Sequence, residues 1–166
     1  MSTGQPPADL VAVQILGLPL GLYRDSSEHS DGLFRELALV QRSENDESSV
    51  PARLLRLIDE LQVSFGAFAA KPSAARDEAL ARGDEEIDLA YEVPSRAREA
   101  ALELDALLDE ADAFCRAGEH LLTLATPRVI VAFRKWFLAE FVAQIDGAPP
   151  TPWAEFAARS GGPAAT

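Results

Sequence analysis

The sequence is poor in cysteine, histidine and positive charge, and each shortage excludes a class of function. A single cysteine, Cys115, cannot form an internal disulfide or a thiolate zinc site, which fits a reducing compartment. The 166 residues carry 15 basic and 27 acidic side chains, a net charge of −12, and no run of Lys and Arg. Such a surface repels phosphate backbones and anionic lipids, so we expect neither nucleic-acid binding nor membrane binding.

Motifs that carry common chemistries are also missing. The sequence has no glycine-rich phosphate loop, no G-x-S-x-G nucleophile elbow and no H-E-x-x-H metal motif. Any mechanism that needs an imidazole must use His29 or His120, and His120 is better explained by a structural role near a helix end. These absences predict no cofactor and favour a non-catalytic protein, without settling whether the chain is an enzyme.

The apolar content, 48%, is enough to bury a core in a chain of single-domain size. We expect a disordered leader at 1–8, one helix-rich globular domain at 9–147, and a Pro/Gly-rich tail at 148–166 that is mobile beyond Trp153. The leader lacks the features of a signal peptide, and charged residues interrupt the longest apolar stretch. The sequence therefore predicts a cytoplasmic protein.

Hydrophobic periodicity predicts a mainly α fold with a minor two-stranded β element, an α+β class. Apolar residues alternate from Ile87 to Val93, which is typical of a strand with one solvated face. Pro51 and Ser73 begin helices, and Gly66 and Pro72 end one. The expected order is strand, helix, helix, short helix, strand, helix, helix, at about 10–16, 22–42, 51–66, 73–82, 86–93, 95–116 and 127–147. Whether the two strands pair with each other stays open.

One group of residues has the spacing of a metal site. Asp25 and His29 are one helical turn apart and Glu28 lies beside them, so a carboxylate and an imidazole could bind one ion. The same residues are also typical of a solvated helix end, with Asp25 as the cap and Glu28 supporting it. The second interpretation is the better one, and the sequence assigns no metal.

Two surfaces are candidates for binding a partner. Asp105, Asp109 and Asp112 recur on the polar side of one helix, and we hypothesise that they bind Arg or Lys of another protein. Trp136 and Trp153 complete this predicted contact surface. The helix over 127–147 is apolar on nearly all sides, which predicts either a central position or cover by another chain, such as a second copy in a homodimer.

Two segments carry a family resemblance. The first holds Leu-Pro-Leu at 18–20 and Asp-Gly-Leu at 31–33; the second holds Asp-Glu-Ala-Asp-Ala-Phe-Cys-Arg at 109–116, Phe-Arg-Lys-Trp-Phe-Leu at 133–138 and Pro-Thr-Pro-Trp at 150–153. These resemble a family of small uncharacterised actinobacterial proteins that accompanies the anti-sigma-factor kinases and antagonists of partner-switching signalling. The resemblance implies an accessory signalling role, with a sigma or anti-sigma regulator as the partner, and transfers no catalytic residue.

The leading functional hypothesis from the sequence is a non-catalytic, protein-interaction module in bacterial regulation. The alternative is a small-molecule sensor with an aromatic pocket under the last helix, lined by the cluster Phe133, Trp136, Phe137 and Phe141 together with Trp153. A metal-dependent enzyme that uses Asp25, Glu28 and His29 is the third hypothesis.

Overall fold

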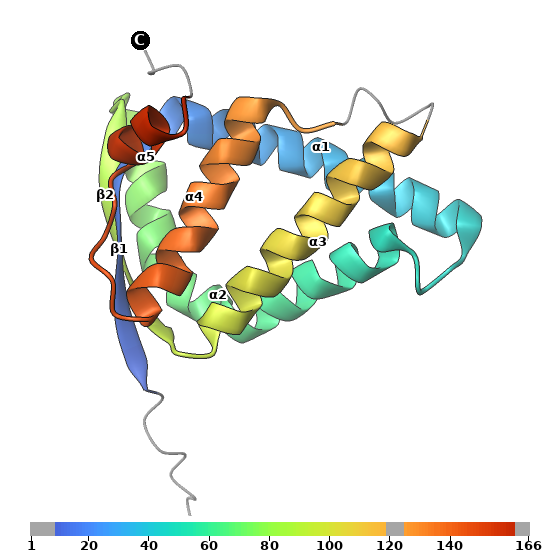
Figure 1. The fold of residues 1–166 in the computed structure, drawn as a ribbon, viewed down its shortest axis with the longest axis horizontal. Coiled ribbons are helices and arrows are strands. Elements are labelled where there is room, and N and C mark those ends of the chain that lie inside the picture. The colour runs from blue at the N-terminus through green and yellow to red at the C-terminus, as the bar shows by residue number, and fades with distance from the viewer. Residues whose placement is uncertain (1–8, 119–124, 162–166) are drawn as a thin grey trace, which may run out of the picture.

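The computed structural model describes residues 9–118 and 125–161, and it confirms a mainly helical fold with a two-stranded antiparallel sheet. The sheet stands at one side of the molecule, and helices extend away from it (Figure 1). The elements in chain order are β1 (Leu10–Pro19), α1 (Leu20–Glu44), α2 (Val50–Arg82), β2 (Glu86–Pro94), α3 (Ala97–Ala117), α4 (Arg128–Ile145) and α5 (Trp153–Arg159).

The two strands pair with each other, which answers the question that the sequence left open. Val13 lies opposite Tyr91 and Ile15 opposite Leu89, so the apolar residues of both strands share one face. The register shifts between Ile15 and Leu18, where Gly17 adopts a left-handed conformation with φ of 64° and donates its N–H to Asp88 Oδ1 at 2.7 Å. This bulge lies just before the point where β1 ends at Pro19 and helix α1 begins at Leu20.

The side chain of Gln144 in α4 covers part of the outer edge of β1. Its Oε1 accepts a hydrogen bond from Gln14 N at 2.8 Å, and its Nε2 donates to Gln14 O at 2.7 Å. The amide therefore satisfies both backbone groups that a third strand would otherwise pair with. Gln144 Nε2 also donates to Glu140 Oε2, which in turn accepts from the backbone N–H of Thr151.

The prediction that α2 ends at Gly66 and Pro72 is wrong. The helix runs without interruption from Val50 to Arg82, with Pro72 buried inside it, and it changes direction along its length (Figure 1). Proline removes one backbone hydrogen bond and bends a helix without having to end it. The predicted helix end at residue 82 is confirmed, because Gly83 adopts a left-handed conformation and forms the C-cap.

The prediction of a mobile tail beyond Trp153 does not match the structure. Residues Trp153–Arg159 form helix α5, which packs against β1 and α4 and buries Ala157. The short helix is anchored by the indole of Trp153, which makes edge contacts with Phe133 at 5.8 Å and Trp136 at 5.5 Å. Tertiary contacts therefore order a segment whose composition alone indicates a loop.

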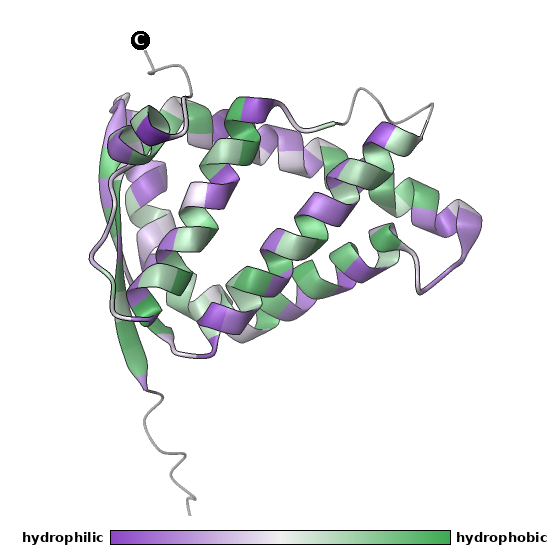
Figure 2. Ribbon diagram, in the orientation of Figure 1, coloured by the Kyte–Doolittle hydropathy of each residue, from purple (hydrophilic) through white to green (hydrophobic). Residues whose placement is uncertain are grey.

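The buried apolar residues form two separate clusters. Figure 2 shows apolar stretches along β1 and mixed polar and apolar residues along α3 and α4. The sheet core joins the strands, α4 and α5 with the start of α1, the second half of α2 and the start of α3; it contains Val13, Ile15, Leu18, Leu20, Ala79, Leu89, Tyr91, Val93, Ala97, Phe133, Trp136, Trp153 and Ala157. The helix core joins α1, the first half of α2, and α3; it contains Leu33, Leu37, Leu54, Leu57, Leu107, Ala111 and Cys115.

Helix α4 takes a central position, which is one of the two alternatives that its apolar character predicted. It packs against α1, α3, α5 and β1. None of the helices that the structure describes combines the length and the apolar character needed to cross a bilayer.

Candidate functional site

A groove of about 810 Å³ that is open to solvent, called the cavity below, lies between the sheet core and the helix core. Five elements contribute to its wall: α1, the middle of α2, β2, the start of α3, and α4. The apolar side chains that line it include Ile58, Leu61, Phe65, Phe68, Ala69, Tyr91, Val93, Ala97, Ala101, Leu104, Phe137, Leu138 and Phe141. Both its size and its apolar lining are those of a small-molecule site.

The aromatic side chains of the cavity form an ordered group. The ring of Tyr91 meets Phe141 edge-on at 5.1 Å and Phe137 at 6.3 Å. Phe137 and Phe141 are among the aromatics that the sequence offered for a pocket under the last helix. The other three candidates, Phe133, Trp136 and Trp153, do not line the cavity and instead pack together in the sheet core.

Polar groups gather at one part of the cavity wall. The guanidinium of Arg76 lies 4.3 Å from the centre of the Tyr23 ring, a cation–π contact. Burial raises the pKa of Tyr91 to about 12, while the charge of Arg76 partly opposes the shift. The Tyr91 hydroxyl therefore stays protonated at neutral pH and can donate a hydrogen bond. Arg76 and Tyr23 were not predicted as site residues, because the sequence shows neither the bend in α2 nor the proximity of α1.

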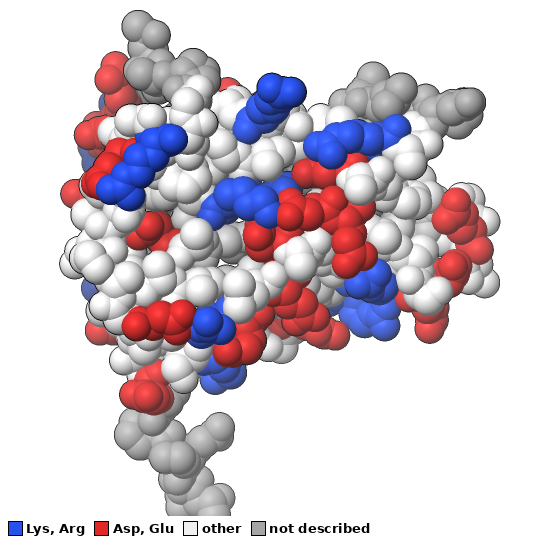
Figure 3. Space-filling view, in the orientation of Figure 1, with Lys and Arg blue, Asp and Glu red and all other residues white. Residues whose placement is uncertain are grey.

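The acidic residues predicted to bind a partner are engaged within the molecule. Lys135 Nζ lies 2.9 Å from Asp105 Oδ2 and 2.5 Å from Asp109 Oδ2, across the contact between α3 and α4. Arg134 pairs with Asp109 at 2.7 Å and with Asp112 at 3.1 Å. Figure 3 shows basic side chains directly against an acidic area on this face. The sequence revealed the carboxylates but could not show that α4 supplies their cations.

Both tryptophans proposed for the contact surface are buried in the sheet core. Trp136 is fully buried, and its indole N–H donates to the backbone oxygen of Thr151 at 2.8 Å. Trp153 packs beside it. A partner would have to displace α5 or the segment before it to reach either indole.

The structure brings the three metal candidates into no common site. His29 Nε2 lies 3.0 Å from Thr126 Oγ1, and no group of three His, Cys, Asp or Glu side chains suited to a metal exists among the residues that the structure describes. Burial lowers the pKa of His29 below its ordinary 6.5; Asp112 opposes this shift and Arg134 reinforces it. His29 is therefore neutral at pH 7. The other histidine, His120, lies outside the described residues.

The contact between His29 and Thr126 does not form a nucleophile–base pair of the kind used in hydrolases. The Thr126 hydroxyl donates to Asp112 Oδ1 at 2.5 Å, so the carboxylate and not the imidazole receives its proton. Helix α4 begins after Pro127 and has no side-chain cap hydrogen bond. The group instead connects α1, α3 and α4 as a buried polar network.

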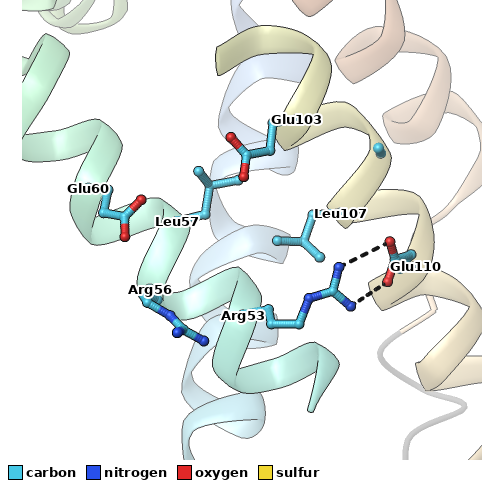
Figure 4. Close-up of a pocket in the computed structure, with 8 residues that line it drawn as sticks. Arg53, Arg56, Leu57, Glu60, Glu103, Leu107 and Glu110 are labelled. Carbon is cyan, nitrogen blue, oxygen red and sulfur yellow. Dashed lines mark hydrogen bonds and ion pairs between the residues drawn. The ribbon is translucent and has the colours of Figure 1, made fainter. Parts of the chain in front are cut away.

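A second hollow, of about 360 Å³, lies between α2 and α3 (Figure 4). Arg53 crosses it and pairs with Glu110 through two nitrogen–oxygen distances of 2.9 and 3.4 Å. Arg56, Glu60 and Glu103 also line it. Two arginines and three glutamates line this hollow, and the partners of the ion pair are about half exposed, so it is a solvated contact between helices.

Comparison of the chain with models of protein families, with curated proteins and with solved structures gave no match. The candidate site therefore depends on the geometry of this molecule alone.

Proposed function

We propose that the protein is a non-catalytic small-molecule-binding module, and that the cavity between its two cores is the binding site. The observation that carries this proposal is the cavity itself: about 810 Å³ lined by apolar and aromatic side chains from five elements. Sites of this size hold ligands of drug-like or lipid-like dimensions, with few polar groups to orient them.

The position of the cavity supports a sensing role. Ile58, Leu61 and Leu104 on its wall pack against the helix core, whereas Phe65, Phe137 and Phe141 pack against the sheet core. A ligand in contact with both groups would hold the two cores together. Because a ligand that binds only one arrangement of a protein stabilises that arrangement, occupancy would alter how readily the two cores move apart.

The interaction hypothesis has weaker support than the ligand hypothesis. The carboxylates of Asp105, Asp109 and Asp112 pair with α4, and Trp136 and Trp153 are buried, so the predicted contact residues are satisfied internally. A role beside sigma or anti-sigma regulators, or as a homodimer, remains a prediction from the sequence. A regulatory partner that distinguishes the ligand-bound state would have to bind a surface other than these predicted contact residues.

The experiment that tests the proposed function uses the neutral fluorescent probe N-phenyl-1-naphthylamine, which brightens in apolar surroundings. We expect saturable fluorescence enhancement with the wild-type protein. Ala69→Phe places a large side chain on the cavity wall and should abolish the enhancement. Ala67→Phe is the matched control, because Ala67 is exposed on the same helix and does not line the cavity.

Circular dichroism and a thermal melt establish that both variants fold. Absence of enhancement with the wild-type protein, or equal enhancement with both folded variants, would refute binding in the cavity.

A further inference from the structure

The cavity contains one charged side chain whose hydrogen-bonding capacity is incompletely used. The side chain of Arg76, in the second half of α2, is 17% exposed, and its Nε is buried without a hydrogen-bond partner. Among the described residues its one ion pair is a contact of 3.4 Å between Nη2 and Oδ1 of the adjacent Asp77, whose own side chain is 69% exposed. A long contact with an exposed carboxylate compensates little for the burial of a guanidinium.

The cavity wall differs in charge from the rest of the molecule. The chain has a net charge of −12, yet Arg76 is the one side chain charged at neutral pH among the described residues that line the cavity. No aspartate or glutamate faces it in that set. Such a wall favours an anionic ligand over a cationic one, since a buried charge needs a partner of opposite sign.

The neighbours of Arg76 are suited to a carboxylate. Guanidinium groups bind carboxylates through two parallel N–H···O bonds, which would use the donors that Arg76 leaves unpaired. Tyr23 stacks on the guanidinium and limits its rotation. The hydroxyl of Tyr91 lies close enough to Arg76 for the guanidinium charge to affect its pKa. Because this hydroxyl is protonated, it adds a neutral hydrogen-bond donor for a carboxylate. Phe65, Phe137 and the rest of the apolar wall would surround the body of the ligand.

We propose that the ligand is a hydrophobic monocarboxylic acid, bound as its anion, whose carboxylate pairs with Arg76 and whose apolar body fills the cavity toward Phe137 and Phe141. This inference rests on the proposed function, because it names the chemical class that the same cavity selects. It assigns Arg76 as the residue that determines specificity for the anion.

Two matched pairs of compounds test the inference by competition against N-phenyl-1-naphthylamine at pH 7.5. Decanoate is compared with 1-decanol, and 2-naphthoate with 2-naphthamide, so that each pair differs in charge more than in shape. For the wild-type protein we expect the acid of at least one pair to bind about tenfold or more tightly than its neutral counterpart. Arg76→Gln should remove that preference while leaving the affinity for the neutral compound nearly unchanged.

Arg82→Gln is the control variant, because Arg82 lies on the same helix, is exposed, and pairs with Asp84 outside the cavity. It should keep the full preference for the acid. Equal affinities for acid and neutral compound in the wild-type protein, a preference that survives in Arg76→Gln, or failure of all four compounds to displace the probe would each overturn the carboxylate inference. In these cases the probe still binds and the proposed function stands. Failure of the probe itself to bind would instead refute the proposed function.

Discussion

Arg134 of α4 donates a hydrogen bond of 3.1 Å to Asp112 of α3, and both side chains are nearly buried, 11% and 4% exposed. Asp112 also accepts from Thr126, so one carboxylate connects α3, α4 and the segment that precedes α4. The pair lies beside the contact between Thr126 and His29 of α1. A buried carboxylate in this position makes the arrangement of three helices depend on a few polar contacts.

Removal of Asp112 should therefore destabilise the fold strongly. Asp112→Ala leaves the buried guanidinium of Arg134 with only its half-exposed partner Asp109, and removes the acceptor of Thr126. We expect a loss of about 3–5 kcal/mol in the free energy of unfolding, measured by urea denaturation. Glu110→Ala is the control on the same helix, where the exposed pair with Arg53 should contribute about 1 kcal/mol or less. Similar losses in both variants would contradict the importance of the buried pair.

The stability of the protein should fall as the pH drops through 6.5. Burial lowers the pKa of His29 in the folded state, so below its ordinary value of 6.5 the unfolded chain binds the proton more readily. The stabilising effect of the neutral imidazole is full above pH 6.5 and declines as the pH falls toward the folded pKa. His29→Gln should flatten the dependence between pH 7.5 and 5.5 in urea denaturation. A proton NMR titration that places the midpoint of His29 at or above 6.5 would contradict this.

The edge of β1 should open when Gln144 is replaced. Gln144→Leu removes both hydrogen bonds to the backbone of Gln14 and leaves its N–H and C=O without those partners. We expect a loss of about 1–3 kcal/mol in stability, as for other buried polar groups left unpaired. Amide hydrogen exchange measures the effect directly, because the N–H of Gln14 should be protected in the wild-type protein and exchange faster in the variant. Gln62→Leu, an exposed position, should leave this exchange unchanged.

Glycine at position 66 is expected to weaken α2. A Cβ added there meets no atom within 4 Å, and the residue lies inside a continuous helix. Gly66→Ala should raise the free energy of unfolding by about 0.5–1 kcal/mol, because alanine loses less backbone entropy than glycine on forming a helix. Thermal denaturation provides the measurement. A lower melting temperature would show that the bend of α2 requires glycine, since the added methyl group itself has room.

Local chemistry made much of the secondary structure predictable. The alternation of β2, the helix start at Pro51 and the helix end at residue 82 all depend on neighbouring residues, and all appear in the structure. The secondary-structure predictions failed where contacts between residues far apart in the sequence determine the local structure. Pro72 lies inside a helix because both halves of α2 pack, the first against the helix core and the second against the sheet core.

The candidate site was predictable only in part. Aromatic residues at helical spacing on the last helix indicated either core or a pocket, and the structure divides them: Phe133 is core, while Phe137 and Phe141 line the cavity. Arg76 carried no signal, because one arginine in an alanine-rich helix is ordinary in a sequence. The acidic face of α3 was clear in the sequence and suggested a site for a basic partner. In the structure, the cations that neutralise this face lie on α4 of the same chain.

The sequence by itself determined the class of the fold, the strand pattern, most helix boundaries, and an excess of negative charge. The fold class and the element boundaries follow from apolar residues that repeat every two or 3.6 positions, which is a local property of the sequence. The negative charge follows from composition, which is a sum over residues. Only the tertiary structure decided that the strands pair, that Asp112 meets Arg134 across 22 residues of sequence, and that a cavity with one partly buried arginine lies between two cores. These depend on how helices pack, which brings together residues whose spacing along the chain has no fixed period.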